Sequence, residues 1–437
     1  MSSAALTGDP ATLLLSLPAA DCPTCAALWA AEREHLTGRR HTRPADGTGL
    51  RSVLHPHCPR HPYAVPGRPR GETPYGPLLG RRVEHDAGLR LWVSDVVLTV
   101  PPGTRGHPAV VGGGIADDPD EALTIGWVEA LERRCTLRRP RERLRFTGRP
   151  VSTLRTPDTA ADDPPQWRVA AHRLCDGETV WLPLPHAVVD SQRHDPADAD
   201  VRTDSTGMAA HPDRDSALFR GARELLERTA LHAWWTGPGS HRCTGHSART
   251  LEWLRDSAHV LPGVTVDVWH VRKGSWYVAG CLLLTPRHDG IVRAAFGSGA
   301  APNVEAAVAA ASREAYQMHT APRISLTPAG AARFGPATGH TVVPGDYGAR
   351  FRRAFPADSS CTPARREHGA APDLPDGGLL HSVLDSLGAP AAFSDCGDQL
   401  TDALGLHVVR VMCPGLPRLT PATRSASGGL RPRFLGA

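Results

Sequence analysis

The stretch DSTGMAAHPDRDSALFRGARELLERTALHAWW, residues 204–235, decides how the chain is interpreted. Its apolar residues at 217, 218, 222, 225, 226 and 230 recur close to the 3.6-residue period of an α-helix, which predicts a helix from about Arg214. Glu224 and Glu227 are three residues apart in it, and Arg228 follows directly. Because positions i, i+3 and i+4 share one helix face, these charged side chains project together.

The same charged trio occurs in a second segment predicted to be helical, and the same i, i+3 spacing occurs in a third. PDEALTIGWVEALERR, 119–134, carries Glu129, Glu132 and Arg133, and NVEAAVAAASREAYQMH, 303–319, carries Glu314 and Gln317 three residues apart. A solvated helix face with ion pairs explains any single copy. The repetition instead favours a shared site, where Mg²⁺ with a nucleotide phosphate neutralises the carboxylates and arginine binds a phosphate oxygen.

Four segments, in order, resemble the YcaO family. They are ADDPDEALTIGWVEALERRC at 116–135, the stretch at 204–235, AAFGSGAAPNVEAAVAAASREAYQ at 294–317 and the closing segment at 379–419 with its Pro-Gly-Leu. The resemblance implies an α/β (α+β) YcaO-like fold, with several helices packed on mixed sheets. Apolar runs at 89–100, 264–271, 276–285 and 406–414 are predicted to be strands of it.

The resemblance also implies a function. In the azoline-forming branch, a Cys, Ser or Thr side chain of a ribosomal precursor peptide attacks the preceding carbonyl, and ATP with Mg²⁺ phosphorylates the oxyanion, so that thiazoline or oxazoline forms. Carried onto this sequence, the magnesium and phosphate site would comprise Glu129, Glu132, Arg133, Glu224, Glu227, Arg228, Glu314 and Gln317. An E1-like or leader-binding partner protein is expected beside the peptide, and a homodimer is compatible with the family.

Several positions depart from the family pattern. Family members usually have Gly-Lys-Gly before the first helix, whereas this chain reads VVGGGIADD at 110–118 and has Lys273 as its only lysine. Ile125 stands where a serine is usual, Ala310 where an arginine is usual, and Thr229 where an aspartate is usual. The proline-alternating terminus of azoline-forming members is replaced by RPRFLGA. The departures keep a second hypothesis open, namely a catalytically degenerate YcaO-fold scaffold that docks a peptide or partner enzyme. The Gly112–Gly114 run could nevertheless offer backbone N–H groups to a phosphate.

The first 75 residues have a different texture and suggest a small separate module. DCPTC at 21–25 and HCPRH at 57–61 give C-x2-C and C-x2-H knuckles, so Cys22, Cys25, Cys58 and His61 form a candidate structural Zn²⁺ site. Unrelated thiols, and His55 or His57 as the fourth ligand, remain alternatives. The predicted organisation is a Cys/His module at 1–75, a YcaO-like domain at 78–419 and a tail at 420–437.

Composition sets the remaining expectations. A formal net charge of +4 carried almost entirely by arginine is typical of a GC-rich genome, so no nucleic-acid partner is expected. No apolar run approaches the length of a membrane span, and ten scattered cysteines fit reduced thiols, so we expect a soluble cytoplasmic protein without a membrane partner.

Overall fold

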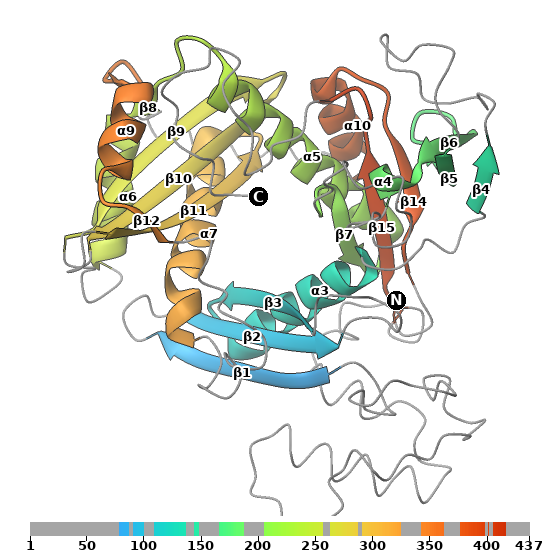
Figure 1. The fold of residues 1–437 in the computed structure, drawn as a ribbon, viewed down its shortest axis with the longest axis horizontal. Coiled ribbons are helices and arrows are strands. Elements are labelled where there is room, and N and C mark those ends of the chain that lie inside the picture. The colour runs from blue at the N-terminus through green and yellow to red at the C-terminus, as the bar shows by residue number, and fades with distance from the viewer. Residues whose placement is uncertain are drawn as a thin grey trace, which may run out of the picture.

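The computed structural model describes residues 78–86, 91–99, 109–136, 144–147, 166–187, 205–256, 263–286, 291–324, 342–361, 376–397, 401 and 405–416 (Figure 1). The predicted Cys/His module and the predicted tail lie outside these residues. So do the predicted zinc ligands Cys22, Cys25, Cys58 and His61, and the zinc prediction stays a prediction.

The mixed α/β fold class is confirmed: helices pack on several sheets (Figure 1). One antiparallel sheet has the order β1-β2-β3, formed by Leu78–Asp86, Leu91–Thr99 and Ala109–Ala116. A second has the order β12-β11-β10-β9, formed by Val342–Pro344, Ile291–Ala301, Trp276–Pro286 and Thr265–Lys273. The third has the order β4-β5-β14-β15-β7, formed by Leu144–Thr147, Gln166–Arg173, Ala392–Asp395, His407–Met412 and Met208–His211, with β6, Thr179–Pro183, paired to β5.

Three long helices connect these sheets (Figure 1). Helix α3, Pro119–Thr136, packs on β2 and β3 and reaches β7, and helix α7, Val304–Ile324, packs on β11 and β10 and reaches β3. Helix α5, Arg214–Thr236, packs on β15 and β7 on one side and on β9, β10 and β11 on the other. The shorter described helices are α4, Leu184–Ala187; α6, Thr244–Asp256; α9, Tyr347–Ala354; and α10, Asp376–Leu387.

Strand β10 shows why the second sheet accepts helices on both faces. Its residues alternate between two apolar clusters: Val278 and Leu282 pack with α5, whereas Cys281 and Leu283 pack with α7. Such continuous apolar patterning is what a sheet covered on both faces requires. The strand and helix predictions for these regions are confirmed, with β9 and β10 each within two residues of the predicted bounds.

A cluster of aromatic rings closes the end of α5. Trp234 stacks on Trp269 with 4.2 Å between ring centroids and on Phe355 with 4.1 Å, and its Nε1 donates to the carbonyl of His241. Both Trp234 and Trp235 are buried, so they belong to the core and not to a surface on which a base could stack. A short pair of parallel strands, β8 (Arg242–Cys243) and β13 (Ala357–Asp358), lies nearby.

Buried Asp267 ties this end of the molecule together electrostatically. Its Oδ1 accepts from Arg242 at 2.9 Å and its Oδ2 from Arg352 at 3.1 Å, so the carboxylate has a cationic partner on each oxygen. A buried carboxylate is tolerated only with such compensation. None of the described helices is both long enough and apolar enough to cross a membrane.

Glycine permits the close approach of α3 to β3. A Cβ at Gly112 would lie 2.1 Å from the carbonyl oxygen of Gly126, and one at Gly114 would lie 1.8 Å from that of Ala122. The middle residue Gly113 points the other way, where a Cβ would meet only the side-chain amide of Gln317 at 2.6 Å. Two of the three glycines are thus required for packing.

This geometry predicts different costs for two neighbouring substitutions. Gly112→Ala forces a methyl group into helix backbone, so we expect the free energy of unfolding to fall by about 1–3 kcal/mol. Gly113→Ala displaces only the end of a flexible side chain and should cost less than about 1 kcal/mol. Denaturant unfolding of both variants tests this, and equal losses would contradict the packing explanation.

Candidate active site

Each of the three long helices carries a glutamate that reaches back to the strand or turn preceding its own helix. The backbone N–H of Gly113 donates to Glu129 Oε2 at 2.6 Å, and that of Gly207 donates to Glu224 Oε2 at 3.0 Å. In the third unit the N–H of Ser298 donates to Glu314 Oε2 at 2.5 Å. The repeated glutamate pattern therefore corresponds to a repeated structural unit, in which a backbone N–H orients a carboxylate 16 or 17 residues further along the chain.

The other two glutamates link different units. Glu132 Oε1 of α3 accepts from the N–H of Ala210 in β7 at 2.6 Å, across 78 residues. Glu227 Oε1 of α5 accepts from the hydroxyl of Ser298 in β11, and that hydroxyl is also 3.2 Å from Glu314 Oε2. Side chains from α3, α5 and α7 are thereby brought to one region between the sheets.

A cavity of about 730 Å³ opens beside this region. It is lined by residues of β3, α3, β7, α5 and α7, among them Gly113, Glu129, Glu132, His211, Arg220 and Gln317. Asp118 and Glu121 at the start of α3 add acidic side chains to the wall. The charged groups in the lining are therefore mostly acidic, with Arg220 as a cationic group among them.

The eight predicted site residues occupy different places around the cavity. Glu129, Glu132 and Gln317 line it, and Glu224 is close enough to Glu132 to affect its ionisation. Glu227, Arg228 and Glu314 form a second group around Ser298, one helical turn along α5 from Glu224. Arg133 is largely exposed and pairs with Glu129 of its own helix at 2.5 Å, outside the cavity lining.

Burial makes the acidic groups hard to ionise. Desolvation raises the pKa of Glu132 to about 8, and the neighbouring Glu224 and Glu129 raise it as well, against the hydrogen bond from Ala210. Desolvation likewise raises the pKa of Glu314 to about 7, with Arg228 opposing the shift and Glu227 adding to it. The raised pKa values mean that the negative charge of these carboxylates is disfavoured, and a nearby cation would stabilise that charge. Strongly shifted acidic groups beside a cavity are typical of functional sites.

Two residues of this region, Arg220 and Ser298, are not among the predicted site residues. Arg220 lies two turns before Glu227 on α5, and burial lowers the pKa of its guanidinium, with Glu132 opposing that shift. Arg220 and Ser298 carry no motif of their own. Arg220 could have been found from the helical spacing of α5, because it precedes Glu224 by four residues. Ser298 could be found only from the tertiary contact of β11 with α5.

The glycine run 112–114, which is predicted to offer backbone amides to a phosphate, has one amide already engaged. The N–H of Gly113 donates to Glu129, and a Cβ at Gly112 or Gly114 would meet the backbone of α3. Phosphate binding by this run stays a prediction. Ile125, at the position of the usual serine, is 41% exposed and lines the cavity, which makes that part of the wall apolar.

The donor set fits Mg²⁺ with a polyphosphate better than Mg²⁺ alone. Carboxylate oxygens are the ligands that magnesium prefers, and the metal is commonly held by one or two of them together with substrate phosphates. In the described part of the chain, no three of these carboxylates bring their oxygens within 4.8 Å of one another. Phosphate oxygens and water would have to complete the coordination.

Comparison with known proteins identifies the fold. A family model described as YcaO cyclodehydratase, ATP- and Mg²⁺-binding, matches residues 113–417, well over half of the chain. The chain belongs to the YcaO family. The match begins at Gly113 of β3 and ends just beyond β15, so it contains all three glutamate-bearing helices. None of the curated proteins compared with the chain matches it.

Solved structures show the same fold at low sequence identity. The YcaO protein from Methanopyrus kandleri, bound with AMPPCP and Mg²⁺, is 16% identical with a TM-score of 0.55, covering 78% of this chain and 86% of that one. A heterocyclase in complex with substrate and cofactor is 14% identical with a TM-score of 0.56, covering 79% of this chain but only 51% of that one. A chain of the Escherichia coli microcin synthetase McbBCD complex with pro-MccB17 bound is 13% identical with a TM-score of 0.51, covering 77% and 88%.

The raised pKa values predict a pH dependence of stability. Between the ordinary glutamate value of 4.5 and about 8, folded Glu132 holds a proton that the unfolded chain has lost. Since the unfolded state then binds fewer protons, the free energy of unfolding should fall as pH rises through this window. Thermal unfolding measured at a series of pH values should show a smaller loss of stability with rising pH for Glu132→Gln than for the wild type. Glu121→Gln, an exposed change on the same helix, serves as the control and should leave the slope as in the wild type; an unchanged slope in Glu132→Gln would contradict the burial argument.

Proposed function

We propose that this YcaO protein is an ATP- and Mg²⁺-dependent cyclodehydratase component that forms thiazoline or oxazoline rings from Cys, Ser or Thr of a ribosomally made precursor peptide. Membership of the family and the heterocyclase fold support the coarser part, ATP-dependent modification of a peptide. The observation that carries it is the convergence of half-buried glutamates from α3, α5 and α7 beside one cavity.

In this proposal the chain's own residues bind and orient the nucleotide. Glu129, Glu132, Glu224, Glu227 and Glu314 would hold magnesium, and Arg220, Arg228 and Gln317 would contact phosphate oxygens. Mg²⁺-ATP, when bound, would supply the phosphoryl group that makes an amide oxygen a leaving group. The preorganised cations and amides of the site would stabilise the charge that develops on that oxygen.

The missing lysine of the family pattern is compatible with this role. Arg220 lines the cavity in the same region as Glu132, and a guanidinium binds phosphate oxygens with a fork of N–H donors. Because Arg220 lies on the rigid helix α5 beside Glu224, it would be positioned by the same contacts as the carboxylates. We therefore propose that Arg220 contacts phosphate oxygens in a chain that lacks the usual lysine before the first helix.

Partner proteins belong to the same proposal. The microcin synthetase is a complex with pro-MccB17 bound, and the matched heterocyclase chain is about twice as long as the region it shares with this one. We propose that an E1-like or leader-binding protein presents the precursor peptide to the cavity. The predicted Cys/His module at 1–75 would dock that partner.

A catalytically quiet scaffold is the second candidate. The observation that favours it is the apolar Ile125 in the cavity wall, at a position where the family uses a serine. A scaffold of this kind would bind a peptide or partner enzyme without hydrolysing ATP. It would retain the buried glutamates because their hydrogen bonds to β7 and β11 hold the three helices together.

Nucleotide binding separates the two candidates. We expect calorimetry to detect Mg²⁺-dependent ATP binding by the wild type, and Glu129→Gln and Glu224→Gln to weaken it at least about 10-fold, since each removes a carboxylate from the metal site. Glu252→Gln, an exposed change on α6, should bind as the wild type does. Absence of binding by the wild type would favour the scaffold.

The product is tested separately. With a Cys/Ser/Thr-rich precursor peptide encoded beside the gene and its leader-binding partner, mass spectrometry should show loss of one water for each ring formed, dependent on ATP. Arg220→Ala should slow the reaction about 100-fold if it stabilises the transferring phosphoryl group, whereas Arg249→Ala on α6 should not. ATP binding without any loss of water would leave the family assignment intact and contradict azoline formation.

A further inference from the structure

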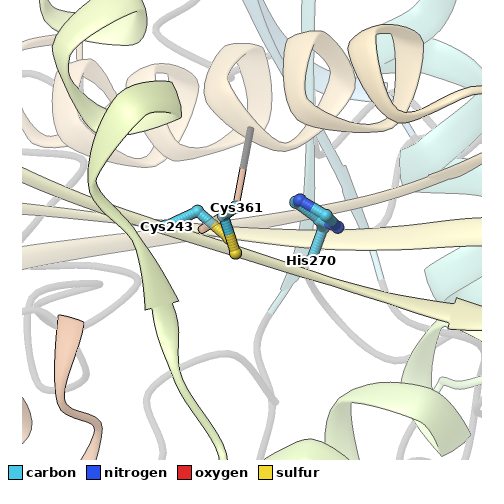
Figure 2. A group of neighbouring side chains, drawn as sticks. All are labelled: Cys243, His270 and Cys361. Carbon is cyan, nitrogen blue, oxygen red and sulfur yellow. The ribbon is translucent and has the colours of Figure 1, made fainter. Parts of the chain in front are cut away.

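Two thiols and an imidazole meet away from the acidic cavity. Cys243, His270 and Cys361 each offer a ligand atom, and the Sγ, N and Sγ atoms all lie within 4.8 Å of one another (Figure 2). The sulfur atoms of Cys243 and Cys361 are 2.6 Å apart. No residue of this trio lines the acidic cavity, so the proposed cyclodehydratase chemistry leaves these side chains unexplained.

Three distant segments are held in register to bring the trio together. Cys243 ends β8, which pairs in parallel with β13, and the N–H of Arg242 donates to the carbonyl of Pro356. Asp358 Oδ1 then accepts from the N–H and the hydroxyl of Ser360, which forms the turn that carries Cys361 back over Cys243. His270 comes from β9, the strand beside β8, and its backbone N–H is hydrogen-bonded to the Cys243 thiol.

The sulfur–sulfur distance alone does not identify the state of the pair. A disulfide requires about 2.05 Å, and two sulfurs bound to one tetrahedral zinc ion lie about 3.8 Å apart, so the pair matches neither arrangement. The two histidines beside the thiols are the evidence that favours a metal ion over a disulfide.

The histidines favour a bridging ion. His270 Nε2 is buried and has no hydrogen-bond partner. His246 Nε2, in the first turn of α6, is likewise buried without a hydrogen-bond partner. The two rings are edge to face with centroids 5.2 Å apart, so His246 lies directly beside His270. A disulfide would leave both nitrogens unsatisfied, whereas a metal ion uses them.

The sequence and the charge are consistent with that choice. Cys243 and His246 form a C-x2-H pair at the junction of β8 and α6, a spacing that lets two side chains approach one ion. His246 would have to turn toward the ion, because only the other three ligand atoms lie within 4.8 Å of one another. Two thiolates also cancel the charge of a divalent cation, so the loaded site can stay buried without a net charge.

We propose that Cys243, His270 and Cys361, completed by His246, bind a zinc-class divalent metal ion that ties β8, α6, β9 and the turn after β13 together. With four protein ligands the site is structural and closed rather than catalytic. Loss of the ion would loosen the turn that carries Cys361, where the hydrogen bonds from Ser360 to Asp358 are local and exposed. The proposal is independent of ATP and of the peptide.

Metal content is the first test, done on the full chain purified with Zn²⁺ under reducing conditions. Because the N-terminal module is itself a predicted zinc site, each variant is made in the wild type and in a Cys22→Ser, Cys25→Ser background. In both backgrounds Cys243→Ser with Cys361→Ser should bind about one zinc ion per chain less than its parent. His270→Ala, which keeps both thiols, should weaken the site, and the control Cys175→Ser, which removes an exposed free cysteine, should leave the content unchanged.

A second measurement needs no variant of the site and so does not depend on the folding of mutants. In the wild type, alkylation of Cys243 and Cys361 followed by peptide mass mapping should be slow with Zn²⁺ and fast after chelation. In the Cys22→Ser, Cys25→Ser background, which lacks two of the predicted N-terminal ligands, Co²⁺ should produce sulfur-to-cobalt charge-transfer bands. Unchanged zinc content in the double serine variant would overturn the proposal. So would a Cys243–Cys361 disulfide in protein purified under reducing conditions, identified by mapping without reductant.

Discussion

The fold depends on hydrogen bonds from backbone N–H groups of strands and turns to half-buried glutamates of the following helices. Gly113 holds Glu129, Gly207 holds Glu224 and Ser298 holds Glu314, and each bond both satisfies a polar group of the backbone and fixes a carboxylate. A buried carboxylate without donors would be far more costly than one with them. The same contact therefore orients the helix on its strand and keeps an acidic group inside the protein.

The glutamates that would bind the metal ion lower the stability of the folded protein. Desolvation and mutual repulsion raise the pKa of Glu132 and Glu314, so part of the folding free energy is spent on keeping acids together. A bound cation would relieve that cost, and ligand binding to the folded state alone stabilises it. Helix α5 is the element that makes the arrangement possible, because it contacts both the sheet containing β7 and the sheet containing β10.

Much of the fold was predictable from local pattern. The 3.6-residue period is enough to predict α5. The acidic residues before Glu121 indicate the start of α3. Asn303, whose side chain accepts from the N–H of Ala306, indicates the start of α7. The strands β2, β9, β10 and β15 were visible as apolar runs. The glycine-rich strand β3 was not, since its glycines lack the side chains that mark a strand and serve helix packing instead.

The sequence by itself determined the chemistry of the residues and their helical spacing: three helices, each with acidic side chains on one face, and a family resemblance. It did not determine which of them meet. Glu132 finds its donor in β7 and Glu227 finds Ser298 in β11, and Cys243, His270 and Cys361 come from segments up to 118 residues apart. Only the tertiary structure decides such contacts, because they follow from how sheets and helices pack and not from local periodicity.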